Sequence, residues 1–135
     1  MADWNSKQYL KFEKERTQPS IDLIGHLTLE NPIKIIDIGC GPGNSTQALH
    51  RRFPSAQILG MDNSPNMIET ASEKYPHLQF LLRDAAEGFD GMDSDFDIVF
   101  SNACIQWVPD HPRLLRNMMG LLRTGGVLAL SLLHI

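Results

Sequence analysis

The chain has 135 residues, of which 42% are hydrophobic and 21% charged, a composition typical of one globular domain with a buried core. Its formal net charge of -4 gives no electrostatic reason to expect nucleic acid as a partner. The longest apolar stretch, residues 127–133, is far shorter than the roughly 20 residues of a membrane-spanning helix, so no membrane segment is expected. Only Cys40 and Cys104 are cysteines, and the polar N-terminus does not resemble a signal peptide, so we expect a cytoplasmic protein without a disulfide framework.

No repeat, low-complexity tract or linker divides the sequence. We therefore expect an N-terminal helical extension over residues 1–30 and one domain over residues 31–135. Helically spaced apolar residues in the extension predict two short helices, over about residues 6–15 and 21–27, with a break at Pro19.

The rest of the chain alternates between short β-branched segments and helical segments. The predicted strands are residues 33–38, 56–61, 78–82, 96–101 and 127–133. The predicted helices are residues 44–53, 65–75 and 112–122, the last of them closed by Gly125-Gly126. Residues 85–95 are expected to form a loop with at most one turn of helix. Because parallel strands need helical crossovers of one hand, this alternation predicts an α/β fold with a Rossmann-like, doubly wound parallel sheet.

A glycine-rich segment directly follows the first predicted strand and leads into a helix. Ligands of open α/β sheets bind at this position, where glycines let the backbone approach them closely. A dinucleotide fingerprint would place glycines at 39, 41 and 44, but position 44 is asparagine. The glycines are instead Gly39, Gly41 and Gly43, and the acidic Asp37 precedes them. This pattern suits a ligand without phosphate and with a cationic amino-acid moiety, such as S-adenosylmethionine.

Polar residues also end the next three predicted strands. Asp62 can accept hydrogen bonds from two ribose hydroxyls, Asp84 from an adenine amine, and Asn102 would lie near the methyl donor. Together with Asp37 they place a polar residue at four successive strand ends, which predicts one shared binding crevice. Two structural readings stay open: the glycines form only a tight turn, or Asp62 is only a turn or capping residue.

No other catalytic or metal site is predicted. The two cysteines have no neighbouring histidine and acid in the sequence, so we interpret them as small buried residues rather than nucleophiles. The five histidines lack the spacing of metal ligands, and no metal is assigned.

These motifs resemble those of the class I S-adenosylmethionine-dependent methyltransferases. The matching segments are Asp37 to Gly43, Asp62, Arg83-Asp84-Ala85 and Leu121 to Leu128. Thr124 stands where proline is common in the family. The resemblance implies S-adenosyl-L-methionine as methyl donor, S-adenosyl-L-homocysteine as product, and a sheet with strand order 3-2-1-4-5-7-6, of which this chain would supply strands one to five.

A second set of residues resembles the trans-aconitate 2-methyltransferases within this family. These residues are Asp3-Trp4-Asn5, Tyr9-Leu10, Phe12, Glu15-Arg16, Pro19, Gly41 to Thr46, Ser64-Pro65, Met67-Ile68 and Asn102 to His111. The resemblance implies transfer of the methyl group to a carboxylate of a small organic acid such as trans-aconitate, giving a methyl ester. A carboxylate is already anionic, so no general base is required.

The resemblance also assigns site residues. The donor would be bound by Asp37, Gly39, Gly41, Gly43, Asp62, Asn63, Asp84, Ala85 and Asn102. The candidates for the substrate pocket are Tyr9, Arg16, Gln106 and Trp107. For Trp107 a plain core position, and for Arg16 a solvated surface position, is an equal alternative.

The chain stops at Ile135, before the family's last strands and substrate cap, so we expect a truncated chain that binds the donor with impaired catalysis. Strand five would then be a sheet edge, and dimerisation through it is one hypothesis. Three alternative functions stay open: a non-catalytic donor-binding module, a methyltransferase with another small substrate, and an NAD-dependent oxidoreductase, which Asp37 and Asn44 disfavour.

Overall fold

The computed structural model describes residues 13–102 and 110–131, with side chains from residue 18 onward. Five parallel strands form one sheet in the order β3-β2-β1-β4-β5. The strands are β1 (Lys34–Ile38), β2 (Gln57–Asp62), β3 (Gln79–Leu82), β4 (Phe96–Asn102) and β5 (Leu122–Ser131). The helices are α2 (Glu13–Gly25), α3 (Asn44–Arg52), α4 (Pro65–Lys74), the 3-10 helix η1 (Ala85–Glu87) and α5 (His111–Met119). The predicted α/β class is confirmed.

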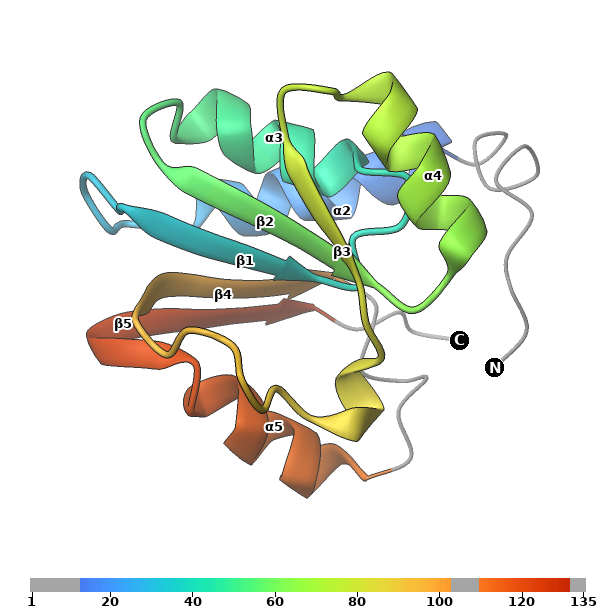
Figure 1. Ribbon diagram of the computed structural model, residues 1–135. Helices are drawn as coiled ribbons and strands as arrows, with labels where there is room; N and C mark the ends of the chain where they lie inside the picture. Colours follow the sequence, from blue (N-terminus) through green and yellow to red (C-terminus); the bar gives the residue numbers. More distant parts are fainter. Residues whose placement is uncertain (1–12, 103–109, 132–135) are drawn as a thin grey trace.

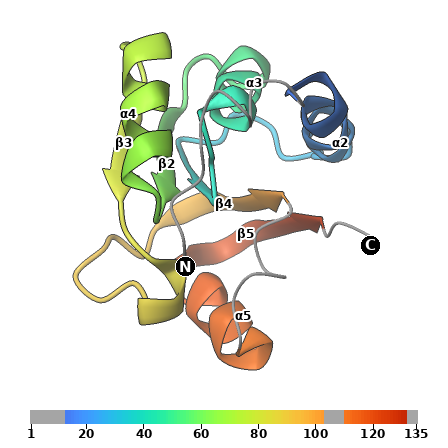
Figure 2. The same ribbon diagram turned by 90° about the vertical axis from the view of Figure 1, so that its right-hand side faces the viewer.

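The elements form three layers. Helices α2, α3 and α4 cover one face of the sheet, and α5 and η1 cover the other (Figures 1 and 2). Successive side chains of a strand point to opposite faces. In β1, Ile35 therefore packs with Leu49 of α3, whereas Ile36 packs with Leu114 and Met118 of α5. The side chain of Asp37 points to the same face as that of Ile35, so it lies beneath the start of α3.

The predicted break at Pro19 is wrong, because α2 continues from Glu13 to Gly25 with the proline inside it. Proline removes one N–H donor from a helix, but packing against neighbouring elements can outweigh that local cost. Here the C-terminal half of α2 is held by its burial: Ile24 is 5% exposed, and it shares a core cluster with Leu27, Leu49 and other residues. Residues 6–12 lie outside the described part of the chain.

The predicted boundary between the last helix and the last strand is also wrong. Helix α5 ends at Met119, with Gly120 as its C-cap, and β5 begins at Leu122 rather than at residue 127. The reason is a long-range contact. The Phe96 N–H donates to the Leu121 carbonyl at 3.0 Å, so the backbone pairs with β4 there and does not continue the helix. Gly125 has a φ of 85° and lies where the β4–β5 register shifts, so it serves a bulge and not a helix end.

The longest helix in the described ranges has 13 residues, too few to span a bilayer.

Candidate functional site

Three of the predicted carboxylates lie at the same edge of the sheet. Asp37 lies near the end of β1, Asp62 ends β2 and pairs with Leu82, and Asp84 follows two residues after β3. The Arg83 N–H donates to the Asp62 carbonyl at 2.9 Å, which joins the ends of β2 and β3. The sheet therefore brings the ends of its first three strands together, as the parallel topology requires.

The glycine-rich loop is a tight turn that is hydrogen-bonded to the end of β2. Its φ angles are 78° at Gly39, 56° at Gly41 and 96° at Gly43, all in the left-handed region that favours glycine. The N–H groups of the loop's first two residues both donate to the Met61 carbonyl, at 2.7 and 2.9 Å. The Gly41 N–H donates to Asp62 Oδ2 at 2.9 Å. The loop and the Asp62 carboxylate are thus one hydrogen-bonded unit.

Gly43 has a packing role that can be stated from the structure alone. A Cβ atom at this position would lie 2.8 Å from Cδ2 of Tyr75 and 3.1 Å from Cζ of Phe80. Any side chain here would push α3 away from α4 and β3. The absence of a side chain at Gly43 therefore lets the start of α3 approach the sheet.

Asp37 is the most unusual residue of the site, because its side chain is completely buried. Its Oδ2 accepts hydrogen bonds from Ser45 Oγ at 2.6 Å and from Thr46 Oγ1 at 2.8 Å. Its Oδ1 is buried and has no hydrogen-bond partner in the part of the chain that the structure describes. Burial raises the pKa of Asp37 to about 6; the two hydroxyls oppose this rise, and Asp62 adds to it. Unsatisfied buried polar atoms are rare, so this oxygen makes Asp37 a candidate contact for a ligand.

Asp62 also makes the turn contact that the sequence left open. Its Oδ1 accepts from the Ser64 N–H at 3.0 Å while its Oδ2 accepts from Gly41. Asn63, between Asp62 and Ser64, is half-buried. The two backbone contacts fix the direction of the Asp62 carboxylate at the sheet edge.

Asp84 caps the short helix η1. Its Oδ1 accepts from the Ala86 N–H at 2.9 Å, and the neighbouring Ala85 is only 7% exposed. Ala85 belongs to the core cluster on the α5 side of the sheet. The position of Ala85 therefore follows from both the cap and the core.

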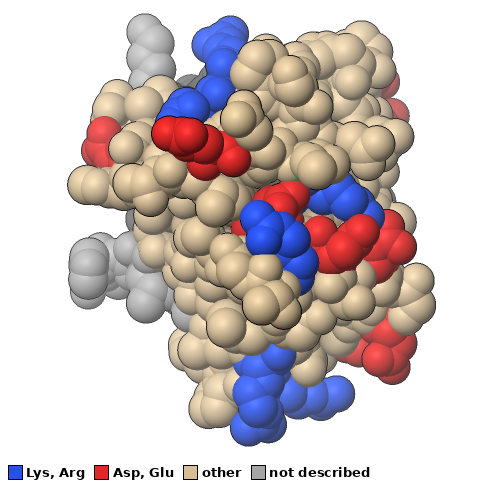
Figure 3. Space-filling view, turned by 90° about the vertical axis from the view of Figure 1, so that its left-hand side faces the viewer, with Lys and Arg blue, Asp and Glu red and all other residues tan. Residues whose placement is uncertain are grey.

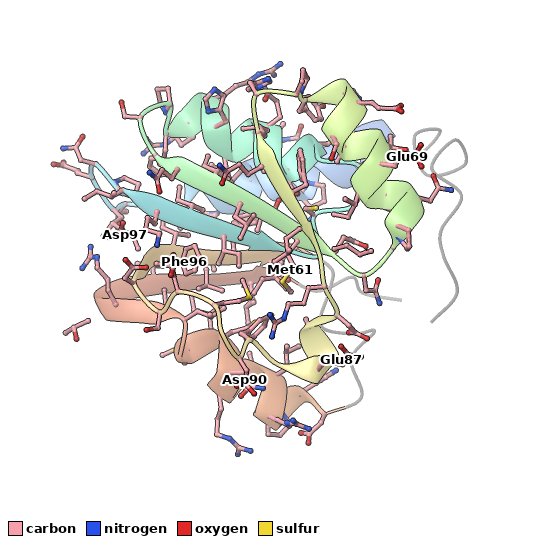
Figure 4. The ribbon with its side chains drawn as sticks, viewed as in Figure 1. Met61, Glu69, Glu87, Asp90, Phe96 and Asp97 are labelled. Carbon is pink, nitrogen blue, oxygen red and sulfur yellow. The ribbon has the colours of Figure 1, made fainter. Side chains whose placement is uncertain are left out.

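Arg83 holds the loop after η1. Its Nε donates to the Gly88 carbonyl at 3.1 Å and its Nη2 to the Asp90 carbonyl at 2.9 Å. Glu87 and Asp90 lie on the α5 side of the sheet (Figure 4). The arginine of the predicted Arg83-Asp84-Ala85 motif thus supports the loop rather than extending into solvent.

Asn102 forms hydrogen bonds with two elements that no motif in the sequence connects. Its Nδ2 donates to Ser20 Oγ of α2 at 2.7 Å, and its Oδ1 accepts from the hydroxyl of Ser131 in β5. Ser20 is 2% exposed. The polar end of β4 therefore fastens the N-terminal helix to the sheet beside the site.

Cys40 is a buried thiol within the glycine-rich loop. It is 3% exposed, and its thiol donates to the Gly41 carbonyl at 3.5 Å. Burial raises its pKa well above the ordinary value, and the nearby Asp37 and Asp62 raise it further. A thiol that stays protonated is a poor nucleophile, in agreement with the interpretation of Cys40 as a small buried residue. Cys104 lies outside the described residues.

The four predicted pocket residues lie outside the described side chains. Tyr9, Gln106 and Trp107 lie outside the described residues, and Arg16 lies in α2 but before the side chains that are described. Among the described residues, no group of three or more histidine, cysteine or acidic side chains could hold a metal ion.

Residues 35–126, which include the glycine-rich loop and the ends of β2 and β3, match a family described as "Methyltransferase domain". A trans-aconitate 2-methyltransferase of Methylobacterium radiotolerans is 47% identical over 132 residues, which cover 98% of this chain and 50% of the relative. The chain thus spans about half the length of this curated relative.

Two solved structures show the same fold. One belongs to a complex of the Haloferax volcanii Trm112 methyltransferase activator with a methyltransferase; it has a TM-score of 0.83 and 21% identity, over 93% of this chain and 56% of that one. The other is Haemonchus contortus phosphoethanolamine N-methyltransferase 2 with phosphomonomethylethanolamine and S-adenosylhomocysteine; it has a TM-score of 0.77 and 25% identity, over 85% of this chain and 28% of that one. The family match covers more than half of the chain, and the chain therefore belongs to the methyltransferase-domain family, with the fold of its class I members.

Proposed function

We propose that this chain is the donor-binding part of an enzyme that transfers a methyl group from S-adenosyl-L-methionine to a carboxylate of a small organic acid such as trans-aconitate. The observation that carries the proposal is the 47% identity to a trans-aconitate 2-methyltransferase over nearly the whole chain. The orphaned Oδ1 of Asp37 beside the glycine-rich loop supports it independently.

The residues at the sheet edge fit this donor. The donor carries a positive amino group and a positive sulfur, and the edge presents Asp37, whose buried charge is met by two neutral hydroxyls among the described residues. In the proposal, Gly39, Gly41 and Gly43 lie along the methionine end, and Asp62 and Asn63 lie at the ribose. Asp84 and Ala85 lie at the adenine, and Asn102 lies near the sulfur. The tie between Asp62 and Gly41 would keep the ribose and methionine subsites at a fixed spacing.

The chemistry needs little from the protein beyond binding and orientation. When bound, the donor supplies a methyl group on a positively charged sulfur; a C–O bond to the acceptor carboxylate forms as the C–S bond breaks, and the electron pair stays on sulfur. No proton moves, so no general base is required. The protein contributes by holding the acceptor oxygen in line with the methyl carbon and by excluding water. Arg16 is proposed to pair with an acceptor carboxylate through its planar guanidinium.

Donor binding can be tested without turnover. S-adenosylhomocysteine at about 100 times its dissociation constant should stabilise the folded chain by roughly 2.7 kcal/mol, measured by thermal or urea unfolding. NAD at the same concentration should not stabilise it, because the loop lacks the third glycine of a dinucleotide fingerprint. Folded protein that responds to NAD but not to S-adenosylhomocysteine would contradict the proposal.

The acceptor is tested by transfer of a radiolabelled methyl group to trans-aconitate and to a panel of other small carboxylic acids. Methyl ester formation on trans-aconitate supports the proposed substrate, and transfer to a different acid would correct it. Donor binding with no transfer to any acceptor would identify a non-catalytic binding module instead. A cytoplasmic location is part of the proposal, because two cysteines cannot form the disulfide framework typical of small secreted domains.

A further inference from the structure

Two hydroxyls converge on one oxygen of a buried carboxylate at the start of α3. Ser45 and Thr46 are consecutive residues of the first turn, and both donate to Oδ2 of Asp37, at 2.6 and 2.8 Å. Oδ1 receives no bond from the described residues. The carboxylate is therefore held from one side only, in a single orientation.

We propose that Ser45 and Thr46 are positioning residues for donor binding: their hydroxyls hold Asp37 through Oδ2 and reserve Oδ1 for the positive charge of the bound donor. The inference rests on the proposed function and assigns roles to two residues that the family resemblance left without any. Thr46 is completely buried, so its hydroxyl acts only inside the protein. Neither residue is proposed to touch the reacting atoms.

Gly60 of β2 supports this assignment independently, because it leaves space for the Thr46 hydroxyl. Gly60 is the strand partner of Asp37, and a Cβ atom there would lie 3.0 Å from Thr46 Oγ1 and 2.6 Å from Cδ1 of Phe80. Glycine weakens a strand interior, so its presence indicates a close approach. The approach here is made by Phe80 and by the hydroxyl that binds Asp37.

The charges around Asp37 make the arrangement dependent on pH. The titratable group that acts on it is Asp62 at the end of β2, and Asp37 in turn raises the pKa of the Cys40 thiol in the loop. Its strand neighbour in β4 is Phe100, and α3 contributes only the two hydroxyls. With no fixed cation among these neighbours, a positively charged ligand favours the ionised carboxylate. The Ser45 and Thr46 hydrogen bonds also lower the pKa of Asp37, so removing either hydroxyl should raise it.

The test measures donor affinity as a function of pH. Dissociation constants of S-adenosylmethionine and S-adenosylhomocysteine would be determined calorimetrically at pH 6, 7 and 8 for Thr46→Val, Ser45→Ala and the rescue variant Thr46→Ser. Ser72→Ala is the matched control, because Ser72 is an exposed helical serine. Melting temperatures without ligand report whether each variant folds.

Thr46→Val should weaken S-adenosylmethionine binding ~10-fold or more at pH 6, the effect of losing a hydrogen bond to a charged group, and less at pH 8, where the carboxylate ionises again. Ser45→Ala should show the same pH trend, and Thr46→Ser and Ser72→Ala should bind as the unaltered chain does. The pH trend should be steeper for S-adenosylmethionine than for the uncharged sulfur of S-adenosylhomocysteine.

A merely structural role predicts a different pattern. Affinity lost equally at every pH, or unchanged affinity in both Thr46→Val and Ser45→Ala, would overturn the inference. In either case, donor binding by the unaltered chain would still support the proposed function. Failure of the unaltered chain to bind either compound would overturn the proposed function, and the inference with it. If Thr46→Val does not fold, the half-buried Ser45 still decides the outcome through Ser45→Ala.

Discussion

Asp37 and Asp97 are both buried aspartates of the same sheet, but they lie at opposite ends of it. Asp97, at the amino end of β4, is 4% exposed, and Asp37, near the carboxyl end of β1, is fully buried. Asp97 Oδ2 accepts from the N–H groups of Ile33 and Lys34 at 2.7 and 2.8 Å, and its Oδ1 accepts from Arg123 Nε. In Figure 4, Asp97 and Phe96 lie at the sheet edge opposite to the glycine-rich loop. Both carboxylate oxygens of Asp97 accept hydrogen bonds, whereas Oδ1 of Asp37 accepts none from the described residues.

The pKa values of the two groups move in opposite directions for this reason. Burial acts to raise the pKa of Asp97, but the bond from Arg123 and the two backbone N–H groups together lower it below its ordinary value. Burial raises the pKa of Asp37 to about 6, because its donors among the described residues are neutral hydroxyls, which oppose the effect of burial only in part. A buried charge that the fold compensates is part of the structure, whereas one that the fold leaves uncompensated is available to a ligand. The comparison therefore separates the structural end of the sheet from the functional end.

The largest expected effect comes from removing the compensated charge. Asp97→Ala leaves the Ile33 and Lys34 N–H groups without their acceptor and the Arg123 guanidinium without its partner. The free energy of unfolding should fall by about 3 kcal/mol, measured by urea unfolding at pH 7. Asp97→Asn keeps a carbonyl acceptor and should lose less.

The control for this change is Asp95→Ala, on the same face of the molecule. The Asp95 side chain is 63% exposed, so its removal should change stability by no more than about 0.5 kcal/mol. Equal effects of Asp95→Ala and Asp97→Ala would mean that burial and backbone bonding at Asp97 contribute nothing.

The second prediction is that the charge of Asp37, unlike that of Asp97, lowers the free energy of unfolding. The effect depends on pH. Because the folded state raises the pKa of Asp37 from 3.8 to about 6, it binds a proton more tightly than the unfolded state between these values. Raising the pH through this window must lower the free energy of unfolding, by about 3 kcal/mol in total and by about 1 kcal/mol between pH 5 and pH 8. In Asp37→Asn this contribution should disappear, so the difference in stability between variant and unaltered chain should grow in favour of the variant as the pH rises. A difference independent of pH would show that Asp37 is ionised throughout.

The sequence predicted the fold well because the signals for it are local. Prolines and glycines mark the element ends around β1, β2 and α4, and β-branched residues fill the buried strands. Ser64 before Pro65 predicts the start of α4, and its side chain accepts from the Met67 N–H as a helix cap. The two errors, at Pro19 and at residues 120–127, both lie where a packing contact or a sheet hydrogen bond from a distant segment decides the local structure.

Only the site residues at the strand ends could be predicted from the sequence. The order of residues places Asp37, the glycines and Asp62 at strand ends, and parallel topology then brings them to one edge. The partners of these residues follow from no sequence spacing: Asn102 meets Ser20, 82 positions away, and Gly60 makes room for Thr46 across the sheet. Ser45 and Thr46 did have a signal, because hydroxyl residues in a first helical turn after a strand-end acid can reach back to it. That signal becomes specific only once the burial of Asp37 is known.

The smallest expected effect belongs to the exposed charges beside Asp97. Lys34 Nζ lies 2.7 Å from Asp93 and 2.6 Å from Asp95, whose side chains are 72% and 63% exposed. Figure 3 shows acidic and basic side chains in contact on this face. Water and salt screen such pairs, so Lys34→Met, which keeps an apolar side chain over the Phe96 ring, should cost less than about 1 kcal/mol. In 1 M NaCl the cost should shrink further; a cost that persists in salt would assign the stabilisation to packing instead.

Lys34→Met also serves as a control in the pH experiment on Asp37. Hydrogen bonds to Asp93 and then Asp95 raise the pKa of Lys34 above 10.5, so its contribution is fully present below that pH and is lost only at higher pH. The lowered pKa of Asp97 means that its contribution is fully present above about pH 4 and is lost as the pH falls. Neither group can produce a slope between pH 5 and pH 8. Lys34→Met should therefore reproduce the slope of the unaltered chain, and a slope that differs only in Asp37→Asn locates the titrating group at the carboxyl end of the sheet.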